Sequence, residues 1–305
     1  MDLQTTSQIL MIRPVNFGYN SETAVNNAFQ VAGITGNIQQ RALEEFETFA
    51  ALLIANNINL VIVNDTPYPH TPDSIFPNNW ISFHAGGDIC LYPMFALNRR
   101  LERKPAIIET ISRQFIIRQT FDFSAREKDH RFLEGTGSMT LDRTNRIAYA
   151  VISPRTDHRV LNEFCETMNF TPHAFHAVDE QRNPIYHTNV MMCIAEEIAV
   201  ICLDSIPDKE EKKNIIRALA HSGKEIISIT FDQMNHFAGN MLQVRDNRNN
   251  KYMVMSEQAF QSLDIPQAKI IERNNRIIAA QLNTIESNGG GSARCMMAEI
   301  FLPLR

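Results

Sequence analysis

A cysteine stands at the end of a glycine-rich loop close to the carboxyl end of the chain. Residues 288–297 read NGGGSARCMM, so three glycines precede Cys295, and an apolar run follows at 298–302. Glycine permits backbone angles and close approaches that residues with a Cβ resist. A thiol held by such a loop at a strand end could attack a small substrate. Taken alone, the segment fits an ordinary glycine turn with a buried cysteine equally well.

Two residues that could transfer protons also precede predicted strands. Glu134 lies in the segment 132–138 between apolar residues and glycines, and His187 lies in the segment 186–189. Most histidines in proteins are surface or core residues, so His187 alone indicates little. Together with Cys295, however, these residue types suit a nucleophile, a general acid/base and an orienting acid. A free thiol has a pKa of about 8.5, so Cys295 needs a neighbour that favours its thiolate.

A proline-braced loop at 71–80 carries a further polar set. It contains Asp73, Phe76, Asn78 and Asn79, and ends on the only tryptophan of the chain, Trp80. These side chains could bind a polar planar group. The loop could equally be a rigid connector.

The bulk composition excludes several classes of protein. The 305 residues have a formal net charge of −5, which gives no electrostatic footprint for nucleic acid or an anionic membrane. The start of the chain lacks the pattern of a signal peptide, and no apolar run has the length of a membrane span. We therefore expect a cytoplasmic enzyme with a small-molecule substrate, without nucleic-acid or membrane partners. A homodimer stays open.

Five cysteines without a C-x-x-C pair indicate neither a disulfide framework nor a zinc site. Four of them, Cys90, Cys165, Cys193 and Cys202, stand in apolar runs or on an apolar helix stripe and are interpreted as core residues. Their reduced state is typical of the cytoplasm.

The segments that must position these residues repeat one theme, which is a pair of strands, a helix and a closing strand. The predicted strands are 8–13, 59–64, 80–83, 89–92, 116–120, 138–141, 147–152, 174–178, 190–195, 198–203, 225–229, 241–244, 252–255, 268–271 and 298–302. The predicted helices are 40–56, 105–115, 158–168, 205–223, a short one from Ser256, and 277–285. Five such units predict pseudo-fivefold repetition in one domain over 1–305, with loops from every unit around one central channel.

The motifs taken in order resemble the guanidine-modifying superfamily, which includes arginine deiminases, dimethylarginine dimethylaminohydrolases and amidinotransferases. The resemblance rests on 73–76 (DSIF), 133–135 (LEG), 153–156 (SPRT), His187, and Gly291-Ser292 followed by Cys295, and it covers nearly the whole chain. It implies an α/β five-bladed propeller, the pentein fold, built from ββαβ repeats. The segments 73–80 and 132–138 are most similar to the citrulline-utilisation hydrolases.

The resemblance also implies roles for individual residues. Cys295 would be the nucleophile, His187 the general acid/base, and Glu134 the partner of His187 or of a substrate nitrogen. Asp73 and its neighbours Phe76, Asn78 and Asn79, with Asn189, would bind the planar head group. Arg155 and one of Arg99 and Arg100 fall where dimethylaminohydrolases bind the substrate carboxylate, although each could instead be a solvated charge. No cofactor or metal is expected, because the thiolate is itself the nucleophile.

Two departures from the family pattern bear on the substrate. Dimethylaminohydrolases carry an acidic pair where this chain has Asn78 and Asn79, and arginine deiminases carry an aspartate where it has Asn189. A buried guanidinium without paired carboxylates is costly, whereas a neutral ureido group needs donors and acceptors, both of which an amide supplies. These departures favour citrulline over arginine.

Other functions remain compatible with the sequence. An arginine or methylarginine deiminase-type hydrolase or an amidinotransferase would use the same residues. A non-catalytic binding propeller would not need an intact Cys295, His187 and Glu134.

Overall fold

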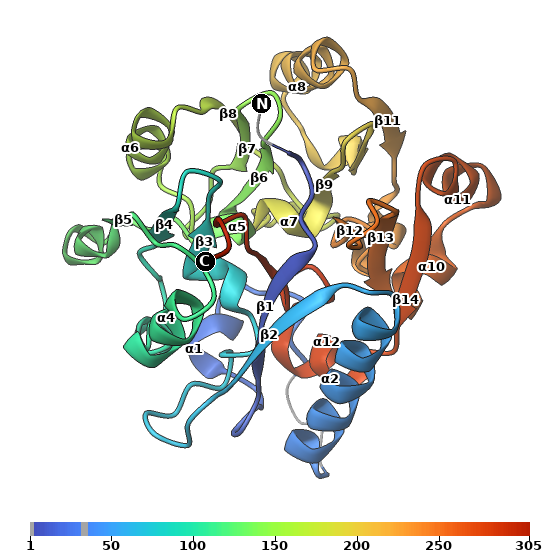
Figure 1. Cartoon of the computed structure of the whole chain (residues 1–305). Coiled ribbons are helices and arrows are strands. Elements are labelled where there is room, and N and C mark those ends of the chain that lie inside the picture. Colours follow the sequence, from blue (N-terminus) through green and yellow to red (C-terminus); the bar gives the residue numbers. More distant parts are fainter. Residues whose placement is uncertain (1–2, 32–35) are drawn as a thin grey trace.

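The computed structural model describes residues 3–31 and 36–305, and their strands form five three-stranded sheets (Figure 1). In each sheet the middle strand is antiparallel to one neighbour and parallel to the other. The sheet orders are β15-β1-β2, β3-β4-β5, β6-β7-β8, β9-β10-β11 and β12-β13-β14. The strands are β1 Gln8–Arg13, β2 Asn59–Asn64, β3 Ile81–Phe83, β4 Asp88–Leu91, β5 Gln119–Asp122, β6 Met139–Asp142, β7 Ile147–Val151, β8 Thr171–Phe175, β9 Met192–Ile194, β10 Ile198–Ile201, β11 Glu225–Ser228, β12 Leu242–Arg245, β13 Lys251–Ser256, β14 Arg276–Ala280 and β15 Ala298–Glu299.

The connection from each middle strand to its parallel neighbour contains a helix, and these helices lie around the outside of the strands (Figure 1). The outer helices are α2 Ile38–Ala55, α4 Pro105–Ser112, α6 His158–Met168, α8 Lys209–His221 and α11 Ile265–Glu272. Shorter helices are α1 Ser21–Ala24, α3 Leu97–Arg100, α5 Gly135–Ser138, α7 Thr188–Met191, α9 Phe231–Asn235, α10 Glu257–Ser262 and α12 Asn283–Gly289, with 3₁₀ turns η1 Pro77–Asn79, η2 Ser124–Asp129 and η3 Leu203–Ser205. The repeated unit is therefore the one predicted from the sequence.

Helix α2 illustrates how the sequence specifies an outer helix. The Asn37 side chain accepts a hydrogen bond from the Gln40 amide, which caps the first turn. Phe46, Phe49 and Leu53 recur at spacings of three or four and are fully buried. The helix therefore covers the first sheet with one apolar face.

The two ends of the chain meet in that first sheet. β15 pairs antiparallel with β1, with Ile9 opposite Glu299 and Leu10 opposite Ala298. The strand predicted at 298–302 is thus shorter than expected. It completes the first unit and so places the preceding segment, which holds Cys295, beside the N-terminal strand.

Two predictions in the fifth unit are wrong. Residues 268–271, expected as a strand, lie within α11, because Asp264 and Gln267 form a capping box and Pro266 occupies the first turn. The start of the helix expected at 277–285 is instead β14, which pairs in parallel with β13, and α12 begins only at Asn283. Short apolar runs rich in isoleucine do not distinguish the two states by themselves.

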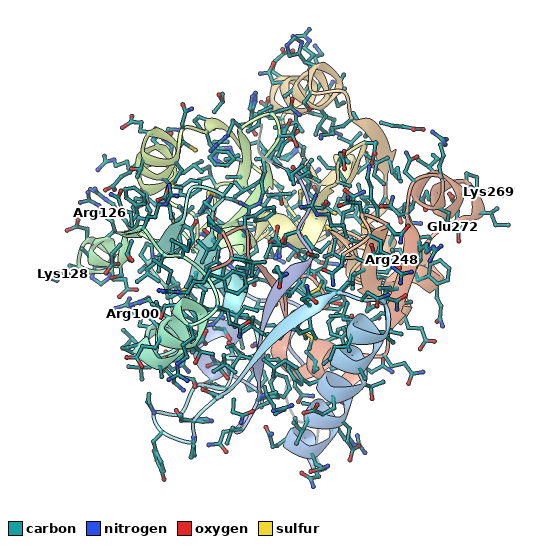
Figure 2. The ribbon with its side chains drawn as sticks, in the orientation of Figure 1. Arg100, Arg126, Lys128, Arg248, Lys269 and Glu272 are labelled. Atoms are coloured by element: carbon teal, nitrogen blue, oxygen red, sulfur yellow. The ribbon has the colours of Figure 1, made fainter. Side chains whose placement is uncertain are left out.

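Apolar residues fill much of the interior in four clusters. Cys193 and Cys202 are in one cluster and Cys90 and Cys165 in another, which confirms their prediction as core residues. Figure 2 shows the charged side chains of Lys128, Lys269 and Glu272 at the rim of the molecule. Among the helices of residues 3–31 and 36–305, none is long and apolar enough to cross a membrane.

Candidate active site

Each unit contributes one short segment directly before its first strand, and these five segments meet inside the molecule. They are η1 before β3, α5 before β6, α7 before β9, residues 237–240 before β12 and residues 290–297 before β15. In Figure 1, α5 and α7 lie inside the ring of outer helices. Asn78 and Asn79 lie in η1, Glu134 directly precedes α5, and His187 directly precedes α7, which contains Asn189. Asn240 and Cys295 lie in the last two segments.

Cys295 is 7% exposed, and its sulfur contacts two amides. Asn240 donates from Nδ2 to Sγ at 3.2 Å, and Asn189 donates from Nδ2 at 3.5 Å. Asn189 was predicted as a residue of the head-group site, and it contacts Cys295. An amide donor favours the negatively charged form of the group that it contacts.

His187 and Glu134 form a buried hydrogen-bonded pair, as the sequence predicted they could. His187 Nε2 lies 2.7 Å from Glu134 Oε2, and the other carboxylate oxygen accepts from the Phe95 amide at 2.9 Å. Burial would raise the pKa of Glu134, but the charge of Arg155 and the hydrogen bond with His187 outweigh it and lower the pKa. Burial lowers the pKa of His187 to about 4, against the opposing effect of Glu134.

These pKa shifts indicate which of the two groups carries a proton at neutral pH. Glu134 is ionised and accepts the proton of Nε2, so the neutral ring of His187 keeps its lone pair on Nδ1. His187 is therefore a base at rest. It can act as an acid only after it has received a proton.

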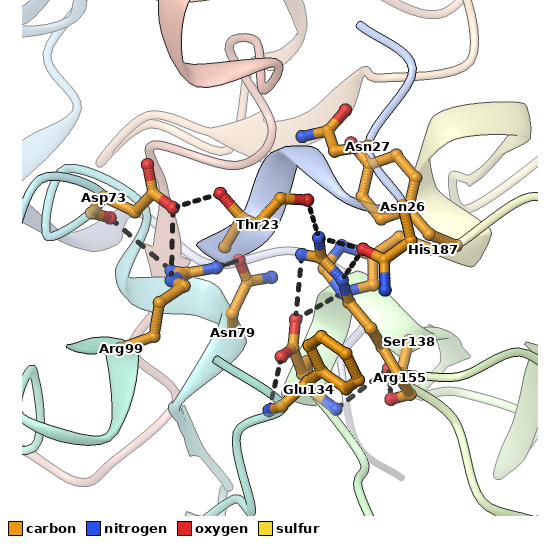
Figure 3. A network of polar contacts seen from close by, with 12 residues as sticks. Thr23, Asn26, Asn27, Asp73, Asn79, Arg99, Glu134, Ser138, Arg155 and His187 are labelled. Carbon is orange, nitrogen blue, oxygen red and sulfur yellow. Dashed lines mark hydrogen bonds and ion pairs between the residues drawn. The ribbon is translucent and has the colours of Figure 1, made fainter. Parts of the chain in front are cut away.

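Arg155 connects this pair to the N-terminal segment that contains α1 (Figure 3). Its NH1 lies 3.5 Å from Glu134 Oε2. Its Nε donates to Asn26 Oδ1 at 2.8 Å, NH2 donates to the same oxygen, and NH2 also donates to the Thr23 carbonyl at 2.8 Å. The Asn26 oxygen thus accepts two N–H groups of one guanidinium, as an oxygen of a bound carboxylate does.

A second arginine, Arg99, holds the loop that contains Asp73 (Figure 3). Its Nε and NH2 donate to the two oxygens of Glu102 at 2.9 and 3.0 Å, and NH1 donates to Asn79 Oδ1 at 2.8 Å. NH2 also faces the Phe76 carbonyl at 3.2 Å, and Nε lies 3.9 Å from Asp73 Oδ2. Burial raises the pKa of Asp73, against the charge of Arg99. Arg100 instead binds the carbonyls of Met94 and Phe95.

Several buried polar atoms of the predicted head-group residues lack a hydrogen-bond partner among the described residues. They are Asp73 Oδ1, Asn78 Oδ1 and Nδ2, Asn79 Nδ2 and Asn189 Oδ1. Unpaired buried polar atoms are rare in folded proteins and call for a polar partner. This set includes both acceptors and donors, which a planar group with N–H and C=O groups would satisfy.

Asp73, Phe76, Asn79, Arg99, Arg155, His187 and Cys295 line one cavity of about 20 Å³, together with Thr23, Asn27, Tyr186 and Gly289–Gly291. That volume holds about one water molecule. Tyr186 and Asn27 also line a neighbouring cavity of about 710 Å³. Tyr186 donates its hydroxyl to the Gly290 carbonyl at 2.9 Å, which closes the wall between the two cavities.

The glycine loop before Cys295 packs closely against neighbouring side chains. Gly290 has a φ of +65° and ends α12, and a Cβ on Gly289 would lie 2.7 Å from the ring of Phe76. Asn27 and Gln30 donate to carbonyls of the loop, Gln30 at 3.0 Å. The sequence predicted a loop that moves without substrate, and this stays a prediction.

Several residues near the site escaped the sequence analysis, among them Asn26, Glu102 and Asn240 and the cavity-lining Thr23 and Asn27. Asn26 reaches the site only because a segment distant in sequence folds over Arg155. Glu102 follows Arg99 by one helical turn, a spacing that could have suggested the pair. Asn240 follows Gly239 directly before the first strand of the fifth unit, the position that Glu134 and His187 indicate in their own units.

Comparison with known proteins assigns the chain to a family. Residues 13–302 match the family model described as N,N dimethylarginine dimethylhydrolase, eukaryotic. A search of curated proteins found no match.

Solved structures share the fold at low sequence identity. The N-terminal domain of ArgZ, an arginine dihydrolase from the ornithine-ammonia cycle in cyanobacteria, is 17% identical with a TM-score of 0.76, and the match covers 97% of this chain and 98% of that domain. The match to the ArgZ apo structure covers 98% of this chain and 41% of the longer ArgZ chain, at 18% identity and a TM-score of 0.76. A dimethylarginine dimethylaminohydrolase adduct with S-methyl-L-thiocitrulline is 14% identical with a TM-score of 0.64, covering 96% of this chain and 99% of that one.

Proposed function

The chain belongs to the N,N dimethylarginine dimethylhydrolase family of the guanidine-modifying pentein superfamily, and from this premise we propose that it hydrolyses citrulline to ornithine, carbon dioxide and ammonia through a covalent intermediate on Cys295. The observation that carries the proposal is that a cysteine, a neutral histidine bonded to an ionised glutamate, and the Asn79 amide with its unpartnered Nδ2 meet at one cavity. In the same proposal, the five sheets are the blades of a propeller and the chain is one catalytic domain.

The choice of citrulline rests on the charge of the head-group site. Among the predicted head-group residues with an unpartnered buried atom, namely Asp73, Asn78, Asn79 and Asn189, the acid is Asp73, and burial raises its pKa. The ureido group of citrulline is neutral and offers three N–H bonds on two nitrogens and one carbonyl, which suit the donors and acceptors of the Asn78, Asn79 and Asn189 amides. A guanidinium held by one such acid would retain much of its desolvation cost.

Arg155 is our candidate for the α-carboxylate of the substrate. Asn26 presents one oxygen to both Nε and NH2 of Arg155, so an incoming carboxylate could take its place. The exchange would release residues 23–26 from Arg155. It would thereby couple substrate binding to the opening that a cavity of about 20 Å³ requires.

The first chemical step transfers the carbamoyl group to the enzyme. The thiol proton of Cys295 passes to Nδ1 of His187, and the thiolate attacks the ureido carbon. His187, now charged and held by Glu134, protonates the nitrogen that leaves, and the carbon–nitrogen bond to ornithine breaks. The product is free ornithine and a carbamoyl thioester on Cys295.

The second step returns the enzyme to its starting state. Neutral His187 takes a proton from water, and the hydroxide attacks the thioester carbonyl. The carbon–sulfur bond breaks, the sulfur regains a proton, and carbamic acid leaves. Carbamic acid decomposes to ammonia and carbon dioxide. The overall reaction therefore converts citrulline and water to ornithine, ammonia and carbon dioxide.

Arginine is the second candidate, because Asp73 keeps one buried carboxylate oxygen without a partner among the described residues. The same cysteine would then release ammonia first. An amidinotransferase would differ only in the group that accepts the carbamoyl or amidino unit from Cys295.

A substrate panel separates these functions. Citrulline, arginine, agmatine, dimethylarginine and succinylarginine are each incubated with the protein, with and without glycine, and ammonia and amine products are measured. The proposal expects ornithine and ammonia from citrulline, in amounts that glycine does not change. Ammonia and citrulline from arginine, without ornithine from citrulline, would instead assign a deiminase.

Rebuilding the acidic pair tests the head-group argument. Asn78→Glu with Asn79→Asp restores two carboxylates, and an aspartate at 79 can still accept from Arg99. We expect citrulline turnover to fall by tenfold or more, about the effect of one misplaced buried charge, and arginine binding to strengthen. Equal losses for both ligands at unchanged thermal stability would show that the amides do not select the head group.

A further inference from the structure

The side chain of Asn240 touches the sulfur of Cys295 and is almost fully buried. Its Nδ2 lies 3.2 Å from Sγ, and its Oδ1 lies 3.6 Å from the same atom. The exposed fraction of Asn240 is 1%. The other hydrogen-bond partner of Sγ within the described residues is the Asn189 amide, at 3.5 Å.

Two backbone groups fix which end of the Asn240 amide faces the sulfur. The Arg294 amide donates to Oδ1 at 3.1 Å, and Nδ2 donates to the Asn189 carbonyl at 3.0 Å. A backbone N–H can only donate and a carbonyl can only accept, so the reverse orientation would lose both bonds. Asn240 therefore presents the N–H group of Nδ2 to Cys295 at 3.2 Å, closer than Oδ1, which can accept from the protonated thiol at 3.6 Å.

The fold places Asn240 here through its glycine neighbour. A Cβ on Gly239 would lie 2.4 Å from the Val190 carbonyl, which no side chain tolerates. The segment therefore packs directly against α7. The backbone N–H of Asn240 donates to the Phe237 carbonyl at 2.8 Å in a tight turn. Asn240 is in this way the contribution of the fifth unit to the site.

We propose that Asn240 is a catalytic residue that stabilises the thiolate of Cys295 through the N–H group of Nδ2. The sulfur–hydrogen bond breaks, the electron pair stays on sulfur, and the proton passes to the neutral ring of His187, which lines the same cavity. A hydrogen bond to a charged acceptor is about twice as strong as one to a neutral acceptor, so the donor favours the thiolate. The proposal rests on the proposed thiol chemistry at Cys295.

The test measures the reactivity of the thiol and needs no substrate. The rate of alkylation of Cys295 by iodoacetamide is followed from acid to alkaline pH, with the modified peptide identified by mass spectrometry. Asn240→Asp keeps the acceptor for the Arg294 amide but replaces the donor with a carboxylate oxygen. Asn240→Ala removes the donor and leaves Asn189. We expect the pH midpoint of alkylation to rise by about one unit in Asn240→Asp and by less in Asn240→Ala.

Asn275 offers a matched control. It is buried, its Nδ2 donates to the Ile271 carbonyl at 2.8 Å, and its Oδ1 accepts from Gln243, away from Cys295. Asn275→Asp should leave the midpoint unchanged. An unchanged midpoint in Asn240→Ala, or the same rise in Asn275→Asp, would overturn the proposal, and Asn240→Ala carries the test if Asn240→Asp does not fold. If citrulline were not turned over but the midpoint rose as expected, only the proposed substrate would fail.

Discussion

The two buried arginines at the site, Arg99 and Arg155, differ in where their partners come from. Arg99 is held by Glu102, Asn79 and carbonyls of the loop 73–76, all within the second unit. Arg155 is held by Glu134 and, across a long stretch of chain, by residues 23–26. Both side chains are almost fully buried, so burial alone does not distinguish them.

This difference assigns them different work. The guanidinium of Arg99 is held by groups close to it in sequence, whereas Arg155 is held by an oxygen of Asn26 from a distant segment. We therefore propose Arg155 as the ligand of the substrate carboxylate and Arg99 as a brace for the head-group loop. The sequence prediction that Arg99 binds the carboxylate is less favoured by this geometry.

Removing the Arg99 guanidinium should have the largest effect. Arg99→Met leaves Glu102 and Asp73 buried without their cation, which costs about 3–5 kcal/mol of unfolding free energy. Urea denaturation measures it. Combining Arg99→Met with Glu102→Leu should recover much of the loss, because both buried charges of the pair are then gone. If Arg99→Met alone were as stable as the natural protein, Arg99 would not stabilise the head-group loop.

Arg155→Gln should impair binding more than folding. It removes the bidentate partner of the carboxylate, so we expect kcat/KM for citrulline to fall by about 100-fold, mostly through KM. N-carbamoylputrescine, which lacks the carboxylate, serves as the matched substrate. Its kcat/KM should change far less in the variant. Equal losses for both substrates would mean that Arg155 acts only by orienting Glu134.

Acid should destabilise the group around Arg155. The pKa of His187 is about 4 in the folded protein, with burial as the main cause and with Arg155 and Arg99 in the same direction, against about 6.5 unfolded. As pH falls through this window the unfolded chain binds a proton that the folded protein does not, so stability is lost. From about pH 7.5 to about pH 5 the loss from His187 is about 2 kcal/mol.

His187→Gln is the control for this pH effect. His84 is also buried with a lowered pKa and adds a loss of the same sign, so only the difference between natural protein and variant reports His187. Urea unfolding at both pH values should show a smaller loss in the variant. The same loss in both proteins would contradict the assignment of a neutral His187.

The smallest expected effects come from Asn26. Asn26→Ala removes the group that competes with the substrate for Arg155, so KM for citrulline should fall several-fold, the range of one hydrogen bond. Asn26→Asp places a carboxylate on Arg155 and should raise KM. Steady-state kinetics distinguish the two, and a rise of KM in both variants would mean that Asn26 helps to hold the substrate.

The sequence predicted most of the site residues that lie in the segments before the strands. Cys295 could be found because it follows a glycine loop, Glu134 because it lies between apolar residues and glycines, and His187 because it precedes a predicted strand. The structure brings the three residues close together. Asn240 was not singled out because it is uncharged, although it follows Gly239 directly before a predicted strand. Asn26 could not be found at all, since its contact depends on how a distant segment folds over Arg155.

Secondary structure shows the same limit. The helix at α2 was predicted because its apolar residues recur at helical spacing from Ala42 to Leu53, a signal that a strand cannot imitate. In the fifth unit, α11 and β14 were exchanged because each has only a short isoleucine-rich run. In this unit the capping box specifies the helix, and the parallel pairing with β13 specifies the strand. That pairing is a tertiary contact, which a local pattern does not reveal.

The central claim is that citrulline transfers its carbamoyl group to Cys295. Intact-mass spectrometry of the protein quenched in acid during citrulline turnover tests it directly, with Cys295→Ser as the control. We expect a species heavier by one carbamoyl group that maps to the Cys295 peptide, and its absence from Cys295→Ser, which should still bind citrulline. Turnover of citrulline to ornithine by Cys295→Ser at a rate near that of the natural protein would contradict the covalent mechanism.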